Sequence, residues 1–271
     1  MTETVPFNGS GPKKSLGQHW LEDDASLEAM SVAATVQGGD YVLEIGPGQG
    51  SLTAVLLKAG AQVHALEFDR DLIKPLQRAF KDMPDAKLRI GEGDIRTFDF
   101  GTMPESYKIV ANIPYYLTAN LLRLLTDPRT LKPVQAALLM QKEVAERIAA
   151  QPGAMAFVSV AAQFYYEVEL GVVVSADLFI PPPKVDSQIL ILRRRKTPLF
   201  ADVVVNDFFR LVKIGFAQRR KTLLNSLSSG LHLNRTETEA RCAEAGIDPM
   251  RRAQTLSLEE WHQLHSAFSN S

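Results

Sequence analysis

The hydrophobic pattern of the first half of the chain alternates between two periods. Compact apolar runs, typical of strands buried in a parallel sheet, predict strands at 41–45, 62–67, 87–90, 107–111 and 134–140. Apolar residues at helical spacing predict helices near 51–59, 70–80 and 116–125, and an earlier one at 27–34 behind the candidate N-caps Asp24 and Ser26. This alternation indicates a parallel sheet with helices on both faces.

The pattern changes after the fifth predicted strand. Helical stretches at 141–150 and 154–164 precede two extended ones at 166–174 and 187–192. We expect these two to close the sheet as an antiparallel pair, which gives seven strands, and the prolines at 181–183 to stiffen the loop between them. From Thr197 onward only helical spacing remains, which predicts helices at 208–216, 219–227, 236–245 and 258–268, the second of them basic.

These elements predict two domains. Residues 1–196 form an α/β domain that begins with a mobile segment, 1–15, rich in Gly, Ser, Pro and Lys. Residues 197–271 form a small all-helical domain.

Composition is that of a soluble globular protein. The 271 residues, 45% hydrophobic and 23% charged, suffice for a sizeable core. No apolar run reaches the roughly 18 residues of a membrane-spanning helix, and residues 1–14 lack the apolar centre of a signal peptide. Cys242 is the only cysteine, which excludes an internal disulfide and favours a reducing cytoplasm.

The net charge of −1 conceals an uneven distribution. Residues 1–183 carry 16 Lys and Arg against 22 Asp and Glu, whereas residues 184–252 carry 14 against 7. A basic block in a nearly neutral protein indicates a surface that faces a polyanion, although a solvated helical face would have the same composition. We assign contacts with nucleic acid to Lys184, Arg219, Arg220 and Lys221.

A glycine turn follows the first predicted strand directly. The sequence Gly-Pro-Gly-Gln-Gly occupies 46–50, and a helix begins at Ser51. Glycine adopts backbone angles closed to other residues and lets a ligand approach the main chain, while the helix start supplies free N–H groups. The next strand ends in Glu67, where an acid accepts both ribose hydroxyls of a nucleoside. The turn and the acid predict a nucleoside site, although an ordinary strand–helix turn would share the glycines.

The spacing also indicates which nucleoside. Dinucleotide folds carry Gly-x-Gly-x-x-Gly, but here the third glycine comes one residue earlier and Glu44 precedes the turn. This pattern resembles the first motif of S-adenosylmethionine-dependent methyltransferases, whose cofactor has no pyrophosphate. Asp94 and Asn112 follow two further strands, and ligands of parallel sheets bind beyond such strand ends.

The sequence Asn112-Ile113-Pro114-Tyr115 resembles the Asn-x-Pro-aromatic motif of enzymes that methylate exocyclic amines. An aryl amine is a poor nucleophile because its lone pair is delocalised into the ring. The Asn112 side-chain oxygen and a main-chain carbonyl, that of Ile113, would accept hydrogen bonds from its two N–H groups and draw the nitrogen toward tetrahedral geometry. Pro114 would fix the turn, and Tyr115 would stack on the base, which is worth about 1–3 kcal/mol. The structural alternative is a proline turn with a buried tyrosine.

Three more residues complete the predicted site. Asp94 would accept a hydrogen bond from the cofactor's adenine and Ile95 would cover its ring, although an aspartate here also suits an Asx turn or a helix cap. Phe179 would form the second stacking wall for the target base, or else pack in the core.

A sulfonium methyl is already activated, so alignment and desolvation would supply most of the rate. The five histidines and one cysteine show no ligand pattern, and we expect no metal.

Over nearly its whole length, from about Lys13 to the C-terminal helices, the sequence resembles the small-subunit ribosomal RNA adenine dimethyltransferases, the kasugamycin-sensitivity family. Their fold is a Rossmann-like class I methyltransferase domain followed by helices. Trp20 stands where the family usually has Phe, and it keeps an aromatic wall. The matching stretches are 17–21, 44–50, Glu67, 93–94, 112–115, 179–187 and 218–226.

The resemblance implies a reaction and its partners. Two adjacent adenosines in a hairpin near the 3′ end of 16S ribosomal RNA would each receive two methyl groups on N6 from S-adenosylmethionine. The target adenine would be drawn out of its stack. The partner would be an assembling small ribosomal subunit, bound by a cytoplasmic monomer through its basic helical domain. The N-terminal motif would fold over the cofactor. The cofactor residues implied by position are His19, Leu21, Gly46, Glu67, Asp94 and Asn112, and the glycine turn adds Gly48.

Two other functions stay open on the sequence alone. A DNA adenine methyltransferase shares the Asn-x-Pro-Tyr chemistry, but no added base-reading domain is evident. A non-catalytic ribosome-assembly or RNA-binding factor would keep the fold and the basic block. Against it, the intact Gly46, Glu67, Asp94 and Asn112 argue for retained catalysis, and both roles can coexist.

Overall fold

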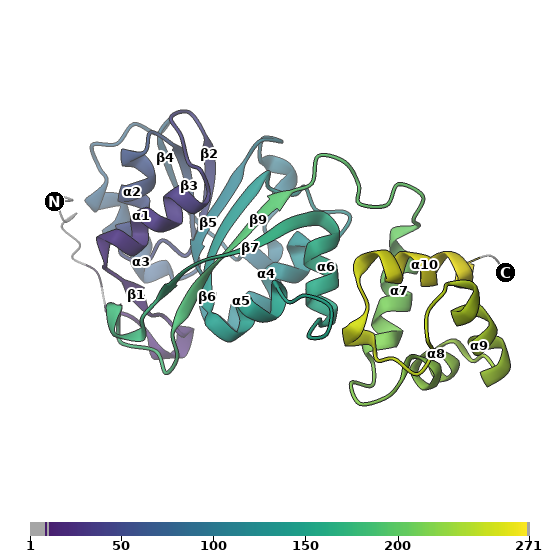
Figure 1. Ribbon diagram of the computed structural model, residues 1–271. Helices are drawn as coiled ribbons and strands as arrows, with labels where there is room; N and C mark the ends of the chain where they lie inside the picture. Colours follow the sequence, from purple (N-terminus) through teal and green to yellow (C-terminus); the bar gives the residue numbers. More distant parts are fainter. Residues whose placement is uncertain (1–8, 10, 270–271) are drawn as a thin grey trace. The chain divides into compact units, whose positions relative to one another are not determined.

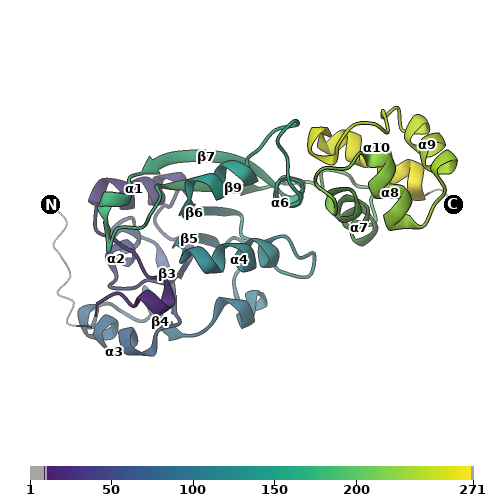
Figure 2. The same cartoon turned by 90° about the horizontal axis from the view of Figure 1, so that it is seen from below.

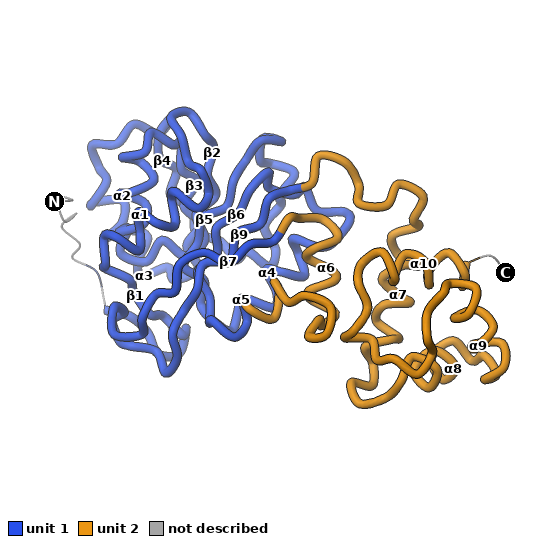
Figure 3. The backbone as a smooth tube through the Cα atoms, viewed as in Figure 1, with its two compact units in different colours: residues 1–145, 168–194 blue, residues 146–167, 195–271 orange. Residues whose placement is uncertain are grey.

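A computed structural model describes residues 9 and 11–269. These residues fall in two compact units, one drawn from Met1–Ala145 and Val168–Arg194, the other from Glu146–Glu167 and Arg195–Ser271 (Figure 3). The sequence predicted a division into 1–196 and 197–271. The units differ from it in the segment 146–167 and in residues 195–196, which group with the C-terminal helices.

The first unit is built on a sheet of seven strands within the described residues, in the order β4-β3-β2-β5-β6-β9-β7 (Figure 1). Strands β2 to β6 pair in parallel, and β9 pairs antiparallel with β6. The seven-stranded, mostly parallel sheet is therefore confirmed. The strands are Tyr41–Ile45 (β2), Gln62–Glu67 (β3), Leu88–Glu92 (β4), Lys108–Asn112 (β5), Gln135–Gln141 (β6), Tyr166–Val174 (β7) and Ser187–Arg194 (β9). A separate two-stranded sheet joins β1 (Trp20–Leu21) to β8 (Phe179–Ile180).

Helices cover the sheet of the first unit. Those of its N-terminal half, α1 (Asp24–Ala33), α2 (Ser51–Lys58) and α3 (Arg70–Ala79), share one buried apolar cluster with the strands. Helix α4 (Thr118–Leu125) lies on the other side of β5 and β6 from α1 (Figure 2). Helix α5 (Lys142–Ile148) follows β6. The first unit thus has the doubly covered α/β fold expected from its alternating pattern.

The first helix begins earlier than the sequence indicated. Asp23 is its N-cap, because its carboxylate accepts a hydrogen bond from the Ser26 N–H at 2.8 Å. The predicted caps Asp24 and Ser26 therefore both lie inside α1. An aspartate one residue upstream satisfies the same free amides of the first turn equally well.

The second unit is helical. Its helices are α6 (Phe157–Tyr165), α7 (Val205–Phe216), α8 (Leu223–Leu231), α9 (Arg235–Glu244) and α10 (Leu258–Ser269). Phe164 of α6 lies 5.1 Å, ring centre to ring centre, from both Phe208 and Phe209 of α7, and Trp261 of α10 is fully buried in the same apolar cluster. This aromatic packing explains why α6 groups with the C-terminal helices.

The basic helix predicted at 219–227 is wrong at its start. Helix α8 begins at Leu223, and Arg219, Arg220 and Lys221 lie in the turn that precedes it. Thr222 caps the helix by accepting from the Asn225 N–H at 3.5 Å. The first amides of α8 donate instead to main-chain carbonyls of the segment 249–251. The three basic side chains are all exposed.

Across residues 9 and 11–269, the helices are too short or too polar for any of them to span a membrane.

Candidate active site

Four predicted site residues meet where the strand order reverses. Gly46, Glu67 and Asn112 stand at the carboxyl ends of β2, β3 and β5, and Asp94 follows β4. Strand β2 lies between β3 and β5, with Glu44 opposite Ala65 on one side and Val110 on the other. This is the position at which open α/β sheets bind ligands.

Two hollows adjoin at this edge of the sheet. Four residues, Gln18, Gly46, Glu67 and Pro114, line both of them. The first hollow is also lined by Leu16, Ile45, Leu66, Phe68, Gly93, Asp94, Ile95, Arg96, Tyr116 and Leu117. The second is also lined by Gly17, His19, Trp20, Gly48, Asn112, Ile113, Tyr115 and Phe179. The shared wall makes the pair suitable for two adjoining ligands.

The glycine turn needs glycine for its backbone and leaves space above it. Gly46, Gly48 and Gly50 have φ of +69°, +59° and +93°, a region that strongly favours glycine. A Cβ placed on Gly46 would meet no atom within 4 Å, whereas one on Gly48 would lie 3.1 Å from Nε1 of Trp20. The turn is therefore open at Gly46 and covered by the indole at Gly48.

Glu67 is held in place by main-chain amides. Its Oε1 accepts from the Asp69 N–H at 2.7 Å, and its Oε2 accepts from the Gly48 N–H at 3.1 Å. The side chain is only 4% exposed, and this burial raises the pKa of the carboxyl. The hydrogen bonds from the two main-chain N–H groups lower it in part. The carboxylate thus joins the glycine turn to the end of β3.

Glu44 is a second buried acid beneath the same turn. Its Oε2 accepts from the Thr53 hydroxyl at 2.6 Å, and its Oε1 has no hydrogen-bond partner among the described residues. Burial raises the pKa of Glu44 to about 8, and the nearby negative charge of Glu67 adds to the rise. At neutral pH the side chain is therefore mostly protonated.

Residues 13–21, which we call the strap, cross both hollows. Trp20 and Leu21 pair with β8, and the His19 Nδ1 lies 2.6 Å from the carbonyl oxygen of Pro181. The His19 ring stacks on Tyr115 with ring centres 5.8 Å apart. The strap is thereby fixed to the proline loop on one side of the second hollow.

The strap also sets the orientation of Asn112. The Asn112 Nδ2 donates to the His19 carbonyl at 3.0 Å, which leaves the amide oxygen as the end available to accept from another amine. The Pro114 carbonyl accepts from the Leu117 N–H at 2.8 Å. The role of the Ile113 carbonyl as main-chain acceptor stays a prediction. The Tyr115 hydroxyl bonds to the Ser187 hydroxyl at 3.0 Å, which fixes its ring.

Asp94 has the local role that the sequence also allowed. Its side chain caps a short helical turn through the Arg96 N–H at 2.9 Å and binds the Arg96 guanidinium with both oxygens. This ion pair lowers the pKa of Asp94. Ile95 is buried and lines the first hollow beside Asp94, as its expected place over an adenine ring requires.

Phe179 and Leu21 are both part of the core. Phe179 is 2% exposed and belongs to the apolar cluster, so it packs in the core; it also lines the second hollow, and its stacking role stays a prediction. Leu21 is 3% exposed and its side chain lies in the same cluster, which leaves a cofactor contact to its main chain.

Several lining residues were not predicted. Phe68 and Tyr116 are 49% and 52% exposed at the rim of the first hollow, and Arg96 lies 5.9 Å from the centre of the Phe68 ring. Phe68 and Tyr116 directly follow Glu67 and Tyr115, so their position beside predicted site residues was the available signal.

The basic residues assigned to nucleic acid lie in both units. Lys184 is exposed in the loop between β8 and β9 of the first unit, and residues 219–221 are exposed in the second. Among the residues that the structure describes, no group of three or more His, Cys, Asp or Glu side chains is placed to hold a metal ion.

Comparison with known proteins gives a consistent result. The family model described as ribosomal RNA adenine dimethylase matches residues 9–270. A ribosomal RNA small subunit methyltransferase A from Dehalococcoides mccartyi is 41% identical over 259 residues, covering 93% of this chain and 87% of the relative. The protein of the same name from Myxococcus xanthus is 38% identical over 265 residues, covering 96% and 92%.

Solved structures show the same fold. The crystal structure of the 23S rRNA methyltransferase ErmE matches with a TM-score of 0.75 and 27% identity, covering 93% of this chain and all of that one. A dimethyladenosine transferase from Plasmodium falciparum matches with a TM-score of 0.76 and 24% identity, covering 93% and 98%. With the family model and the relatives, this establishes that the chain is a methyltransferase of the ribosomal RNA adenine dimethylase family.

Proposed function

We propose that this enzyme transfers methyl groups from S-adenosylmethionine to N6 of two adjacent adenosines near the 3′ end of 16S ribosomal RNA, giving N6,N6-dimethyladenosines during small-subunit assembly. The observation that carries the proposal is the pair of adjoining hollows. Asp94 and Ile95 line the first hollow, Asn112 with its amide oxygen free lines the second, and Glu67 and Gly46 border both. The names of the relatives support the choice of RNA.

The first hollow suits the donor nucleoside. The open space at Gly46 admits a ligand against the main chain. The Glu67 oxygens accept hydrogen bonds from two main-chain N–H groups and keep further lone pairs for ribose hydroxyls. Asp94 and Ile95 line this hollow, where they would contact the adenine, with Phe68 at the rim. When bound, S-adenosylmethionine supplies an activated methyl group on a sulfonium.

The second hollow suits the acceptor adenine. The Asn112 amide oxygen and the Ile113 carbonyl would accept hydrogen bonds from the two N–H groups of the amine. This would localise the lone pair on the nitrogen and direct it at the methyl group. Tyr115 and Phe179 provide aromatic surface for the base. No general base is required, because the methylated amine can release its proton to water; the chain's contribution is alignment and exclusion of solvent.

The helical unit would dock the enzyme on its substrate. Residues 219–221 form a basic turn in which all three side chains are exposed, so they can contact phosphates without losing helical packing. Lys184 would add a contact from the loop that also contains Pro181. We place the enzyme in the cytoplasm as a monomer.

Methylation of defined substrates tests the proposal. Purified enzyme and S-adenosylmethionine are incubated with unmethylated small subunits, with large subunits and with duplex DNA, and modified nucleosides are identified by mass spectrometry. The expected result is dimethyladenosine at two adjacent positions of 16S ribosomal RNA only. Methylation of DNA or of the large subunit would replace the proposed substrate. Tight subunit binding without any methyl transfer would favour an assembly factor.

A further inference from the structure

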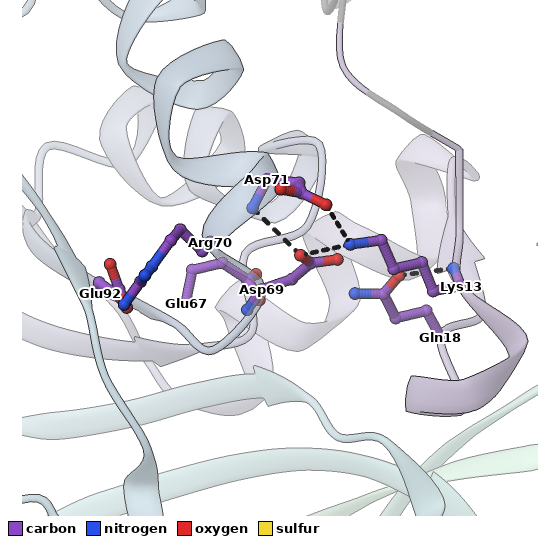
Figure 4. A network of polar contacts seen from close by, with 7 residues as sticks. All are labelled: Lys13, Gln18, Glu67, Asp69, Arg70, Asp71 and Glu92. Atoms are coloured by element: carbon purple, nitrogen blue, oxygen red, sulfur yellow. Dashed lines mark hydrogen bonds and ion pairs between the residues drawn. The ribbon is translucent and has the colours of Figure 1, made fainter.

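The strap is fastened at its start by one lysine. The Lys13 Nζ lies 2.7 Å from Oδ1 of Asp69 and 2.6 Å from Oδ2 of Asp71 (Figure 4). These partners follow Lys13 by 56 and 58 residues, so the ion pairs close a long loop of chain. They bring the strap to the turn that joins Glu67 to α3.

One of these partners shapes the ribose-binding acid. Asp69 is only 5% exposed, and its main-chain N–H is the group that donates to Glu67 Oε1 at 2.7 Å. Its side chain also caps α3 by accepting from the Asp71 N–H at 3.1 Å. Lys13 is therefore the cation that compensates a buried carboxylate two residues from Glu67, and it acts on the turn that holds Glu67 in place.

The same lysine shapes a wall of both hollows. The Lys13 main-chain N–H donates to Oε1 of Gln18 at 2.7 Å, as Figure 4 shows, and Gln18 lines the first and the second hollow. Main-chain bonds from Leu16 and Gln18 to the Lys13 carbonyl tighten the same turn of the strap. Displacement of Lys13 would thus move Gln18 as well as the turn at Asp69.

We propose that Lys13 is a positioning residue for the cofactor, which couples closure of the strap over the hollows to the placement of Glu67. The inference rests on the proposed use of the first hollow for S-adenosylmethionine. Lys13 itself lines neither hollow, and it acts through Asp69 and Gln18.

Charge explains why a cation is required at this place. Glu67 and Asp69 bring two buried acids to the end of β3 and the turn that follows it, and the charge of Asp69 raises the pKa of Glu67. The hydrogen bond to Asp69 in turn raises the pKa of Lys13. Loss of the lysine would leave the Asp69 carboxylate buried without its ion-pair partner, which favours rearrangement of the turn.

A set of strap variants tests the proposal. Lys13→Ala removes the ion pairs of Lys13 with Asp69 and Asp71, and Lys13→Arg keeps the charge. Lys14→Ala removes a neighbouring exposed lysine and serves as the matched control. Dissociation constants for S-adenosylmethionine are measured by calorimetry, and kcat and KM with small subunits as acceptor. We expect Lys13→Ala to raise Kd and cofactor KM on the order of fivefold with kcat nearly unchanged. Lys13→Arg should recover most of the affinity, and Lys14→Ala should match the wild type.

A double-mutant cycle locates the effect. Asp71→Asn alters the exposed partner of Lys13, whose side chain is 68% exposed. If the ion pairs of Lys13 act as a unit, the double variant should lose less cofactor affinity than the sum of the losses in Lys13→Ala and Asp71→Asn. Equal affinities of Lys13→Ala and Lys14→Ala would overturn the inference, as would a fall in kcat at saturating cofactor without a change in Kd. Circular dichroism confirms that each variant is folded.

The same measurements separate this inference from the proposed function. If wild-type protein fails to bind S-adenosylmethionine, or Glu67→Ala binds it equally well, the assignment of the first hollow fails. If both controls behave as expected and Lys13→Ala binds like the wild type, only the role of Lys13 fails.

Discussion

Glu44→Gln should stabilise the protein at neutral pH and leave it unchanged in mild acid. The wild-type carboxyl is fully buried, with one oxygen bonded to Thr53 and the other without a hydrogen-bond partner among the described residues. Burial raises the pKa of Glu44 from 4.5 to about 8. Glutamine has the same shape, keeps an acceptor for Thr53 and carries no charge at any pH.

The sign follows from the protons bound in each state. Between pH 4.5 and about 8 the unfolded chain has lost the Glu44 proton and the folded chain keeps it, so wild-type stability falls as pH rises. The slope is about 1.4 kcal/mol per pH unit, which amounts to about 3 kcal/mol by pH 7. The Gln variant lacks this loss, so its advantage should be near zero at about pH 4.5 and grow steadily toward pH 8.

Urea unfolding at several pH values between about 4.5 and 8 measures the difference. Tryptophan fluorescence, which comes from Trp20 in the first unit and Trp261 in the second, follows unfolding, and far-UV circular dichroism checks the transition. Glu105→Gln, at an exposed position of the same unit, controls for the chemical change itself. A constant difference between wild type and Glu44→Gln over this range would refute the protonated, buried state of Glu44.

Three further variants test the site and the docking surface. Gly48→Ala should weaken S-adenosylmethionine binding in calorimetry, because alanine in a left-handed conformation costs roughly 1–2 kcal/mol and its Cβ would lie 3.1 Å from Trp20. Wild-type affinity would mean that the strap moves aside without cost to accommodate the added methyl group. Asn112→Ala should lower kcat at least about tenfold while Kd for the cofactor changes little, and an unchanged kcat would remove Asn112 from the chemistry. Reversing the charges at residues 219–221 should weaken subunit binding and flatten its dependence on salt, by about 0.7–0.9 in log–log slope for each phosphate that the enzyme no longer neutralises. An unchanged slope in filter binding would place docking elsewhere.

The centre of the sheet was predictable because its inner strands are buried along nearly their whole length. Runs such as Tyr41–Ile45 and Gln62–Glu67 are too short and too apolar to be surface helices, and their ends are marked by Gly46 and Glu67. Since parallel strands end at one edge, the gathering of Gly46, Glu67 and Asn112 followed from the same pattern.

The features that escaped prediction depend on contacts between distant segments. Helical spacing continues through residues 219–227, yet α8 starts at Leu223 because carbonyls of the segment 249–251 take its first amides. Phe164 shows no preference for either unit in the sequence, and its ring contacts with Phe208 and Phe209 decide the matter. The pairing of Lys13 with Asp69 likewise has no periodic signal, because the two residues meet only once the strap lies across the folded sheet.

The second unit is assembled from two separate stretches of chain, with β7 and β9 of the first unit lying between them in sequence. A shortened gene product that stops at residue 196 would therefore keep α6 and discard the helices that shield Phe164. Such a truncation would leave an aromatic surface bare and prone to aggregation. A minimal catalytic fragment would need its apolar α6 positions replaced by polar ones, since no single cut separates the two units.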